Sequence, residues 1–66
     1  MIVGQRIKEL RKEKELSQEV LAKELKISRP ALSHYELGTR DVPNDLIPII
    51  ARYFNVTAGY LFGLEN

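Results

Sequence analysis

Two short amphipathic segments separated by only Lys26 and Ile27 constrain the fold of this chain more than any other feature. Residues 17–25 and 28–37 each begin with a serine, which is a good helix N-cap, and a glycine that can end a helix follows the second segment. A two-residue link is too short for an extended antiparallel hairpin, and it favours the crossing of about 90–120° found in a helix-turn-helix. The sequence therefore predicts this motif over residues 17–37.

The second segment has two chemically different sides. At about 100° per residue, Ala31, Leu32 and Tyr35 fall on an apolar side. The opposite, mostly polar side consists of Arg29, Pro30, Ser33, His34 and Leu37. A helix braced by its neighbour turns its polar side outward, and an α-helix has the width that the major groove of B-DNA admits. This geometry indicates nucleic-acid binding.

Helical periodicity continues on both sides of the motif. Apolar residues at i, i+4 and i+7 predict a first helix over residues 4–14, and an apolar stripe predicts a fourth helix from Asn44 to Phe54. Thr57 is placed to cap a last short helix that runs through Phe62. The chain shows no strand pattern, repeat or low-complexity tract. We therefore expect one all-α domain of five helices over residues 1–66.

The composition argues against several classes of protein. The 66 residues include one histidine and no cysteine, and they contain no glycine-rich phosphate loop and no evident cluster of carboxylates. We therefore expect no metal site, no cofactor and no enzymatic activity. No stretch has the length and hydropathy of a signal sequence or a membrane span, which leads us to expect a cytoplasmic protein without membrane contact. No site for a small-molecule effector is evident.

The charges are unevenly distributed along the chain. The net charge is only +1, which is weak support for a nucleic-acid partner. Residues 1–40, however, contain nine Lys/Arg and six Asp/Glu, whereas residues 41–66 contain one Arg and three Asp/Glu, so the two parts carry +3 and −2. The positive field therefore lies over the predicted helix-turn-helix.

A group of apolar side chains near the C-terminus exceeds what a small core needs. The group consists of Leu46, Ile49, Tyr53, Tyr60, Phe62 and Leu64. The first three form a second apolar stripe on the fourth helix, and a helix that is apolar on two sides needs two packing partners. We expect this group to form a homodimer interface. The alternative is that these residues cover only the underside of their own domain.

The pattern as a whole resembles the phage-repressor/Cro-like (Xre-type) helix-turn-helix family. The resemblance rests on GQRIKELRKEKELSQEVLAKELKISRPALSHYELGTR followed by LIPIIARYFNVTAGYLFG, which together cover nearly the whole chain. It implies a five-helix, lambda-repressor-like domain that binds a pseudo-palindromic operator as a dimer. Three positions depart from the family pattern. Lys26 stands where the turn usually has glycine, Val20 replaces the Glu/Gln of the capping box, and Pro43 stands where the fourth helix usually has a Ser/Thr cap.

The resemblance and the helical wheel together assign roles to individual residues. Base-contacting roles fall on Arg29, Ser33, His34 and Pro30, although Pro30 can equally serve only to stiffen the start of its helix. Phosphate-contacting roles fall on Gln18, Ser17, Ser28, Thr39, Arg40 and Arg11. In the family, the arginine at position 11 typically bridges to the glutamate at position 36, so Arg11 and Glu36 are also expected to form a structural salt bridge.

Two classes of function follow from these observations. The first is a sequence-specific, DNA-binding transcriptional regulator, expected to be a repressor that binds double-stranded DNA as a homodimer. The second is an antitoxin or another protein-interaction module in which DNA binding is secondary. The surplus of apolar residues near the C-terminus suits either class.

Overall fold

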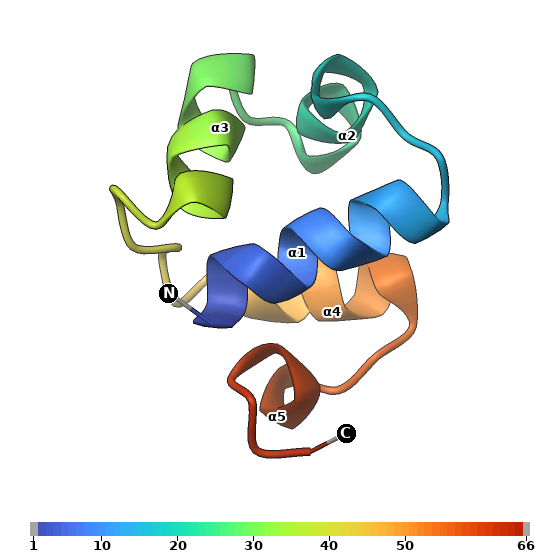
Figure 1. Cartoon of the computed structure of the whole chain (residues 1–66), viewed down its shortest axis with the longest axis vertical. Helices are drawn as coiled ribbons and strands as arrows, with labels where there is room; N and C mark the ends of the chain where they lie inside the picture. Colours follow the sequence, from blue (N-terminus) through green and yellow to red (C-terminus); the bar gives the residue numbers. More distant parts are fainter. Residues whose placement is uncertain (1, 66) are drawn as a thin grey trace.

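Five α-helices and no strand make up residues 2–65, the part of the chain that the computed structural model describes. In chain order the helices are α1 (Ile2–Glu13), α2 (Gln18–Leu25), α3 (Arg29–Leu37), α4 (Ile47–Phe54) and α5 (Ala58–Leu61) (Figure 1). The all-α, five-helix prediction is confirmed. Four of the helices begin and end within about two residues of the predicted bounds.

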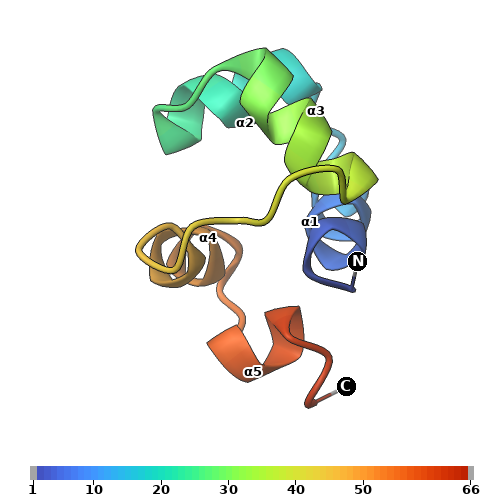
Figure 2. The ribbon, with the colours of Figure 1, turned by 90° about the vertical axis from the view of Figure 1, so that its left-hand side faces the viewer.

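The helices are arranged around α1, which crosses the middle of the molecule. The α2–α3 pair lies on one side of α1, α5 lies on the other, and α4 lies beside α1 (Figures 1 and 2). Helix α1 packs against α3 and α5, α2 packs against α3, and α4 packs against α5. Each helix contributes one large side chain that is completely buried. These side chains are Ile7, Leu21, Leu32, Ile50 and Leu61.

The ends of α2 and α3 are fixed by local hydrogen bonds. The Ser17 hydroxyl accepts from the Val20 N–H at 3.1 Å, and the Ser28 hydroxyl accepts from the Ala31 N–H at the same distance. Lys26, which ends α2, has the left-handed conformation at φ 60° and ψ 41°. The turn therefore keeps the geometry that glycine normally supplies, at a cost of roughly 1–2 kcal/mol for a residue with a side chain. Both helices are well bounded despite the departures from the family pattern.

The fourth helix begins at Ile47, three residues later than the sequence pattern predicted. Residues 44–46 instead form a turn, in which the Leu46 and Ile47 N–H groups donate to carbonyls three residues earlier, at 3.0 and 3.3 Å. Leu46 at the N-cap has no side-chain oxygen to accept a hydrogen bond from the first turn. The usual Ser/Thr cap supplies such an acceptor. The later start places Pro48 in the first turn, where its missing N–H group has no intrahelical partner to lose.

Part of the expected dimer surface belongs to the core of the protomer. Leu46 is only 8% exposed in the protomer, so it packs in the core and offers little surface to a second subunit. Tyr53 and Tyr60 are half-buried. The Tyr53 ring packs edge-on against Phe54 at 5.0 Å between ring centroids, and the Arg6 guanidinium lies 4.3 Å from the centroid of the Tyr60 ring. The exposed members of the group are Ile49, Phe62 and Leu64.

Candidate nucleic-acid interface

Helix α3 presents one side to solvent and buries the other. Leu32, Tyr35 and Glu36 are buried against the rest of the molecule. On the outward side, Arg29, Pro30 and His34 are exposed and Ser33 is half-buried. The structure therefore brings the four predicted base-contacting residues together on the free side of one helix.

The beginning of α3 is electrostatically suited to an anionic partner. Its first turn contains no acidic residue, and Arg29 and Pro30 occupy its first two positions. The Ser28 hydroxyl accepts the Ala31 N–H and retains its own proton, and Ser17 does the same at the start of α2. Both serines are exposed, so each hydroxyl can also donate to a phosphate oxygen. Capping and phosphate contact are compatible at both positions.

A hydrogen-bonded network of three side chains ties α1, α2 and α3 together. Arg11 Nε donates to Glu36 Oε2 at 2.7 Å, and Arg11 Nη2 donates to Glu36 Oε1 at 3.0 Å. Gln18 Nε2 donates to the same Glu36 Oε1, also at 3.0 Å. The Glu36 side chain is 2% exposed, so its charge is compensated inside the fold rather than by water. The pairing of Arg11 with Glu36 expected from the family resemblance is present.

The network separates the roles of Arg11 and Gln18. Arg11 Nη1 donates to the Leu16 carbonyl at 2.8 Å, so each of the three guanidinium nitrogens has a protein acceptor. The Arg11 side chain is also only 12% exposed, which gives it a structural role. Gln18 uses one amide hydrogen on Glu36 and keeps a second one at the N-terminus of α2, where the helix dipole favours an anion. The link from Gln18 to Glu36 was not predicted from the sequence.

Close contact between backbones positions α3 against α1. A Cβ atom built on Gly4 would collide with the carbonyl oxygen of Tyr35, and it would lie 3.3 Å from the Cα of Glu36. Only glycine therefore allows α1 to approach the C-terminal half of α3 so closely. Sequence analysis missed this residue, because the requirement arises from a tertiary contact rather than from a turn.

The residues that follow α3 lie against its last turn. Gly38 has the left-handed conformation at φ 79°, and the Thr39 N–H donates back to the His34 carbonyl at 3.0 Å. His34 Nδ1 lies 2.7 Å from Thr39 Oγ1. The exposed Arg40 places its guanidinium 5.8 Å from the centroid of the buried Tyr35 ring. Arg40 thus lies next to the last turn of α3, and it forms no ion pair with an acidic residue within residues 2–65.

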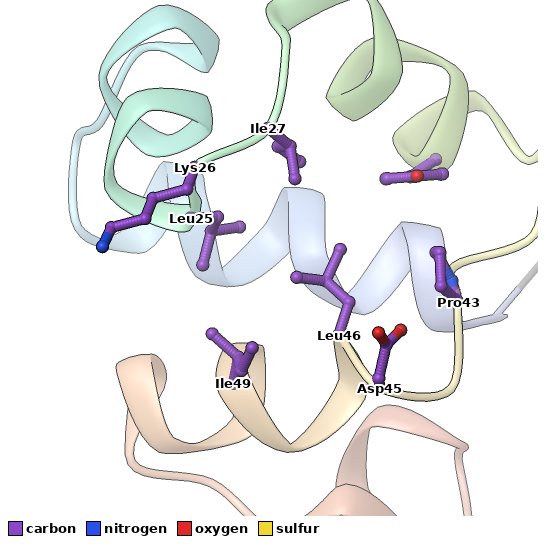
Figure 3. Close-up of a pocket in the computed structure, with 8 residues that line it drawn as sticks. Leu25, Lys26, Ile27, Pro43, Asp45, Leu46 and Ile49 are labelled. Carbon is purple, nitrogen blue, oxygen red and sulfur yellow. The ribbon is translucent and has the colours of Figure 1, made fainter.

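Two of the exposed apolar residues of the C-terminal half line separate crevices, and the third, Leu64, lines neither. Ile49 lines a crevice of about 270 Å³ between the α2–α3 turn and α4, where it points toward Leu25 (Figure 3). Phe62 lines another crevice, of about 340 Å³, together with Ile2 and Val42. The expected dimer residues are therefore not one continuous patch. Ile2, which lines the same crevice as Phe62 and is 44% exposed, was not among the residues expected at the dimer interface.

Two further observations concern the described residues as a whole. None of the helices within residues 2–65 has the length and apolar character needed to cross a bilayer. The same part of the chain contains no group of three or more His, Asp or Glu side chains that could hold a metal ion.

Comparison with known proteins places this architecture in a family. The profile of a helix-turn-helix family matches residues 7–61. Antitoxin PezA of Streptococcus pneumoniae is 46% identical over 56 residues, which cover 85% of this chain and 35% of that protein. The HTH-type transcriptional regulator ImmR of Bacillus subtilis is 35% identical over 66 residues, which cover all of this chain and 52% of that protein. The uncharacterized HTH-type transcriptional regulator YobD of B. subtilis is 35% identical over 62 residues, which cover 94% of this chain and 55% of that protein.

This chain spans from about a third to just over half of the length of these relatives. The family is one of regulators rather than of enzymes, in agreement with the expectation from the sequence. With its five-helix architecture, its outward-facing α3 and a match over residues 7–61, the chain belongs to the Xre/Cro-like helix-turn-helix family.

Proposed function

We propose that this chain binds specific DNA sequences by inserting α3 into the major groove and thereby regulates transcription, as a repressor. The observation that carries the proposal is the outward side of α3, where Arg29, Pro30 and His34 are exposed on a helix whose other side is fixed in the core. The major groove admits an α-helix, and side chains near the N-terminus of a recognition helix contact base edges. A DNA-binding role also agrees with the expected cytoplasmic location.

Each outward side chain of α3 is suited to a different kind of contact with a base. Arg29, in the first turn, can bond guanine O6 and N7 with two parallel hydrogen bonds, the commonest specific contact in the major groove. Ser33 can donate or accept, and His34 can bond a base edge through its free Nε2. Pro30 has no donor, so it contributes an apolar surface that suits a thymine methyl group while it also stiffens the start of the helix.

A second set of residues holds the sugar-phosphate backbone. Ser17, Gln18 and Ser28 are grouped at the N-termini of α2 and α3, and Arg40 follows α3. Contacts of this kind fix the orientation of a protein on DNA without reading its sequence. We leave Arg11 out of this set because its guanidinium nitrogens already have protein acceptors.

We propose that two copies bind a pseudo-palindromic operator, with the two α3 helices about one helical turn (~34 Å) apart. The exposed side chains of Ile49, Phe62 and Leu64 are the members of the expected interface that a partner can still cover. Size-exclusion chromatography with light scattering measures the assembly. Because Ile49 and Phe62 line separate crevices, Ile49→Lys and Phe62→Lys locate the interface: the variant at the interface becomes monomeric, and the other stays dimeric. A wild-type monomer at tens of micromolar would contradict the proposal of a stable dimer.

The experiment that tests the function is selection of binding sites from random duplex DNA at a stated salt concentration. We expect an enriched motif with two related half-sites whose centres lie about 10–10.5 base pairs apart. Selected and random DNA should differ in affinity by at least about 10³-fold, the usual ratio of specific to non-specific binding. Equal affinity for all sequences at low salt would contradict sequence-specific recognition.

A protein-interaction module is the second candidate, and one observation favours it. PezA, which is named as an antitoxin, is 46% identical over most of this chain, and Ile49, Phe62 and Leu64 remain exposed in the protomer. Light scattering on the isolated chain separates the two candidates. A self-sufficient dimer favours the regulator, whereas a monomer that aggregates favours an interaction module that lacks its protein partner.

A further inference from the structure

His34 and Thr39 form a hydrogen-bonded pair at the end of the outward side of α3. His34 Nδ1 lies 2.7 Å from Thr39 Oγ1, and the same Thr39 hydroxyl donates to the His34 main-chain carbonyl at 3.3 Å. The left-handed Gly38 turns the chain back, so that the Thr39 N–H also reaches this carbonyl, at 3.0 Å. The end of the helix therefore fixes the place of Thr39 beside the imidazole.

The number of protons available determines how this pair is bonded. The Thr39 hydroxyl has a single proton and two partners within reach, the His34 carbonyl oxygen at 3.3 Å and Nδ1 at 2.7 Å. Both contacts are hydrogen bonds at once only when the hydroxyl donates to the carbonyl oxygen. The lone pairs of Oγ1 are then the partners of Nδ1, which must carry a hydrogen to donate to them. In a neutral imidazole only one of the two nitrogens is protonated, and the hydrogen bond of one nitrogen sets the state of the other. Nε2 is therefore left without a proton, as an acceptor.

We propose that Thr39 is a positioning residue that fixes the ring and the tautomer of His34, so that Nε2 accepts a hydrogen bond from a base. This inference rests on the proposed insertion of α3 into the major groove. In that groove only adenine N6 and cytosine N4 carry amino hydrogens, whereas guanine offers N7 and O6 and thymine offers O4 as acceptors. The pair therefore selects adenine or cytosine at the position that His34 contacts. Thr39, expected from the family resemblance to contact a phosphate, acts here on base specificity.

The assignment can be tested in the free protein. Long-range ¹H–¹⁵N correlation spectra distinguish the two imidazole tautomers, and they are recorded at a pH well above the range in which histidines titrate. We expect a protonated Nδ1 in the wild-type protein and in Thr39→Ser, which keeps the hydroxyl. In Thr39→Val the oxygen is lost, and the form protonated at Nε2 should become the major one. A wild-type protein protonated at Nε2, or an unchanged tautomer in Thr39→Val, would overturn the proposal.

DNA binding gives the second test. Site selection with wild-type protein and with His34→Ala identifies the base pair that His34 contacts, because the preference at that pair disappears in the variant. Every base pair contains one adenine or one cytosine, so the test removes the amino group of that base. We expect this to lower the affinity of the wild-type protein and to leave that of His34→Ala unchanged. Thr39→Val should reduce the discrimination at that pair by at least about fivefold, the lower end of the range for one mismatched pair. Preferences at the pairs read by Arg29 and the dependence of affinity on salt should stay unchanged.

Two outcomes in this test would overturn the proposal. One is a wild-type affinity that does not depend on the amino group of the adenine or cytosine in the His34 pair. The other is a uniform loss in Thr39→Val on every sequence with a smaller salt slope, because that is the signature of a phosphate contact. The double variant His34→Ala/Thr39→Val is the control, and it should discriminate no worse than His34→Ala alone. If the protein binds no DNA, the proposed function fails, and the spectra of the free protein alone decide whether Thr39 sets the His34 tautomer.

Discussion

Arg29 is the residue whose replacement tests the proposed sequence-specific reading most directly. It occupies the first position of α3, it is exposed, and no acidic residue shares its turn. Arg29→Ala should weaken binding to the selected site by roughly 1–3 kcal/mol, the value of one bidentate contact with guanine. Binding to random DNA should change little, which titration of both duplexes at one salt concentration measures. An equal loss on both duplexes would show that Arg29 contacts only phosphate.

Arg40 is predicted to act on the DNA backbone rather than on bases. Its guanidinium lies beside the Tyr35 ring and has no ion-pair partner among the described residues, so its charge is available to a phosphate. Arg40→Ala should weaken binding to every sequence by a similar factor. It should also reduce the slope of log K against log salt by about one. Affinities measured at four or more salt concentrations test this, and an unchanged slope would remove Arg40 from the interface.

The buried carboxylate of Glu36 makes Arg11 important for stability. Arg11→Ala would leave this carboxylate, 2% exposed, with only the Gln18 amide as a side-chain partner. Loss of one partner of a buried pair costs about 3–5 kcal/mol, which denaturant unfolding measures. Lys8→Ala, at an exposed position of the same helix, is the control and should stay within about 0.5 kcal/mol of wild type. Loss of DNA binding in Arg11→Ala is meaningful only for the fraction that remains folded.

At the scale of whole elements, the crossing of α1 and α3 depends on Gly4. Alanine is normally the better helix residue by about 1 kcal/mol, so propensity alone predicts that Gly4→Ala stabilises the protein. We expect the opposite, a loss of about 1–3 kcal/mol or more, because the new methyl group would collide with the Tyr35 backbone. Gly59→Ala in α5 is the matched control, since its Cβ would meet only the exposed Glu65 side chain, which can move aside by giving up its hydrogen bond from Thr57. Similar unfolding free energies for both variants would contradict the account of this crossing.

Local signals explain which elements the sequence could predict. The serine caps, the apolar period and Gly38 determine α2 and α3 within a few residues, and the predicted bounds of that motif agree with the structure. The start of α4 was misplaced because Leu46 continues an apolar stripe of that helix, whereas residues 44–46 form a turn that lacks a side-chain cap. Gly4, the bond from Gln18 to Glu36 and the His34–Thr39 pair were missed. Each depends on contacts formed in the folded structure, and the local sequence pattern does not determine which residues make those contacts.

At the scale of the whole molecule, the charge distribution matches the layering of the helices. The segment that holds α1, α2 and α3 carries +3, and the segment that holds α4 and α5 carries −2. In Figure 2 the α2–α3 pair and α5 lie at opposite ends of the molecule. The positive field therefore lies over α1, α2 and α3 rather than over α4 and α5, and it favours approach of a polyanion to that part of the molecule.

The most direct test of the central claim is a ¹⁵N–¹H correlation titration of the protein with the duplex recovered by selection. If α3 enters the major groove, the largest shift changes should fall on residues 28–34, with further changes at 17, 18 and 40. The amides of α5 should change least when the oligomeric state is held constant. Changes confined to α4 and α5, or no changes at low salt, would contradict the claim that the outward side of α3 reads DNA.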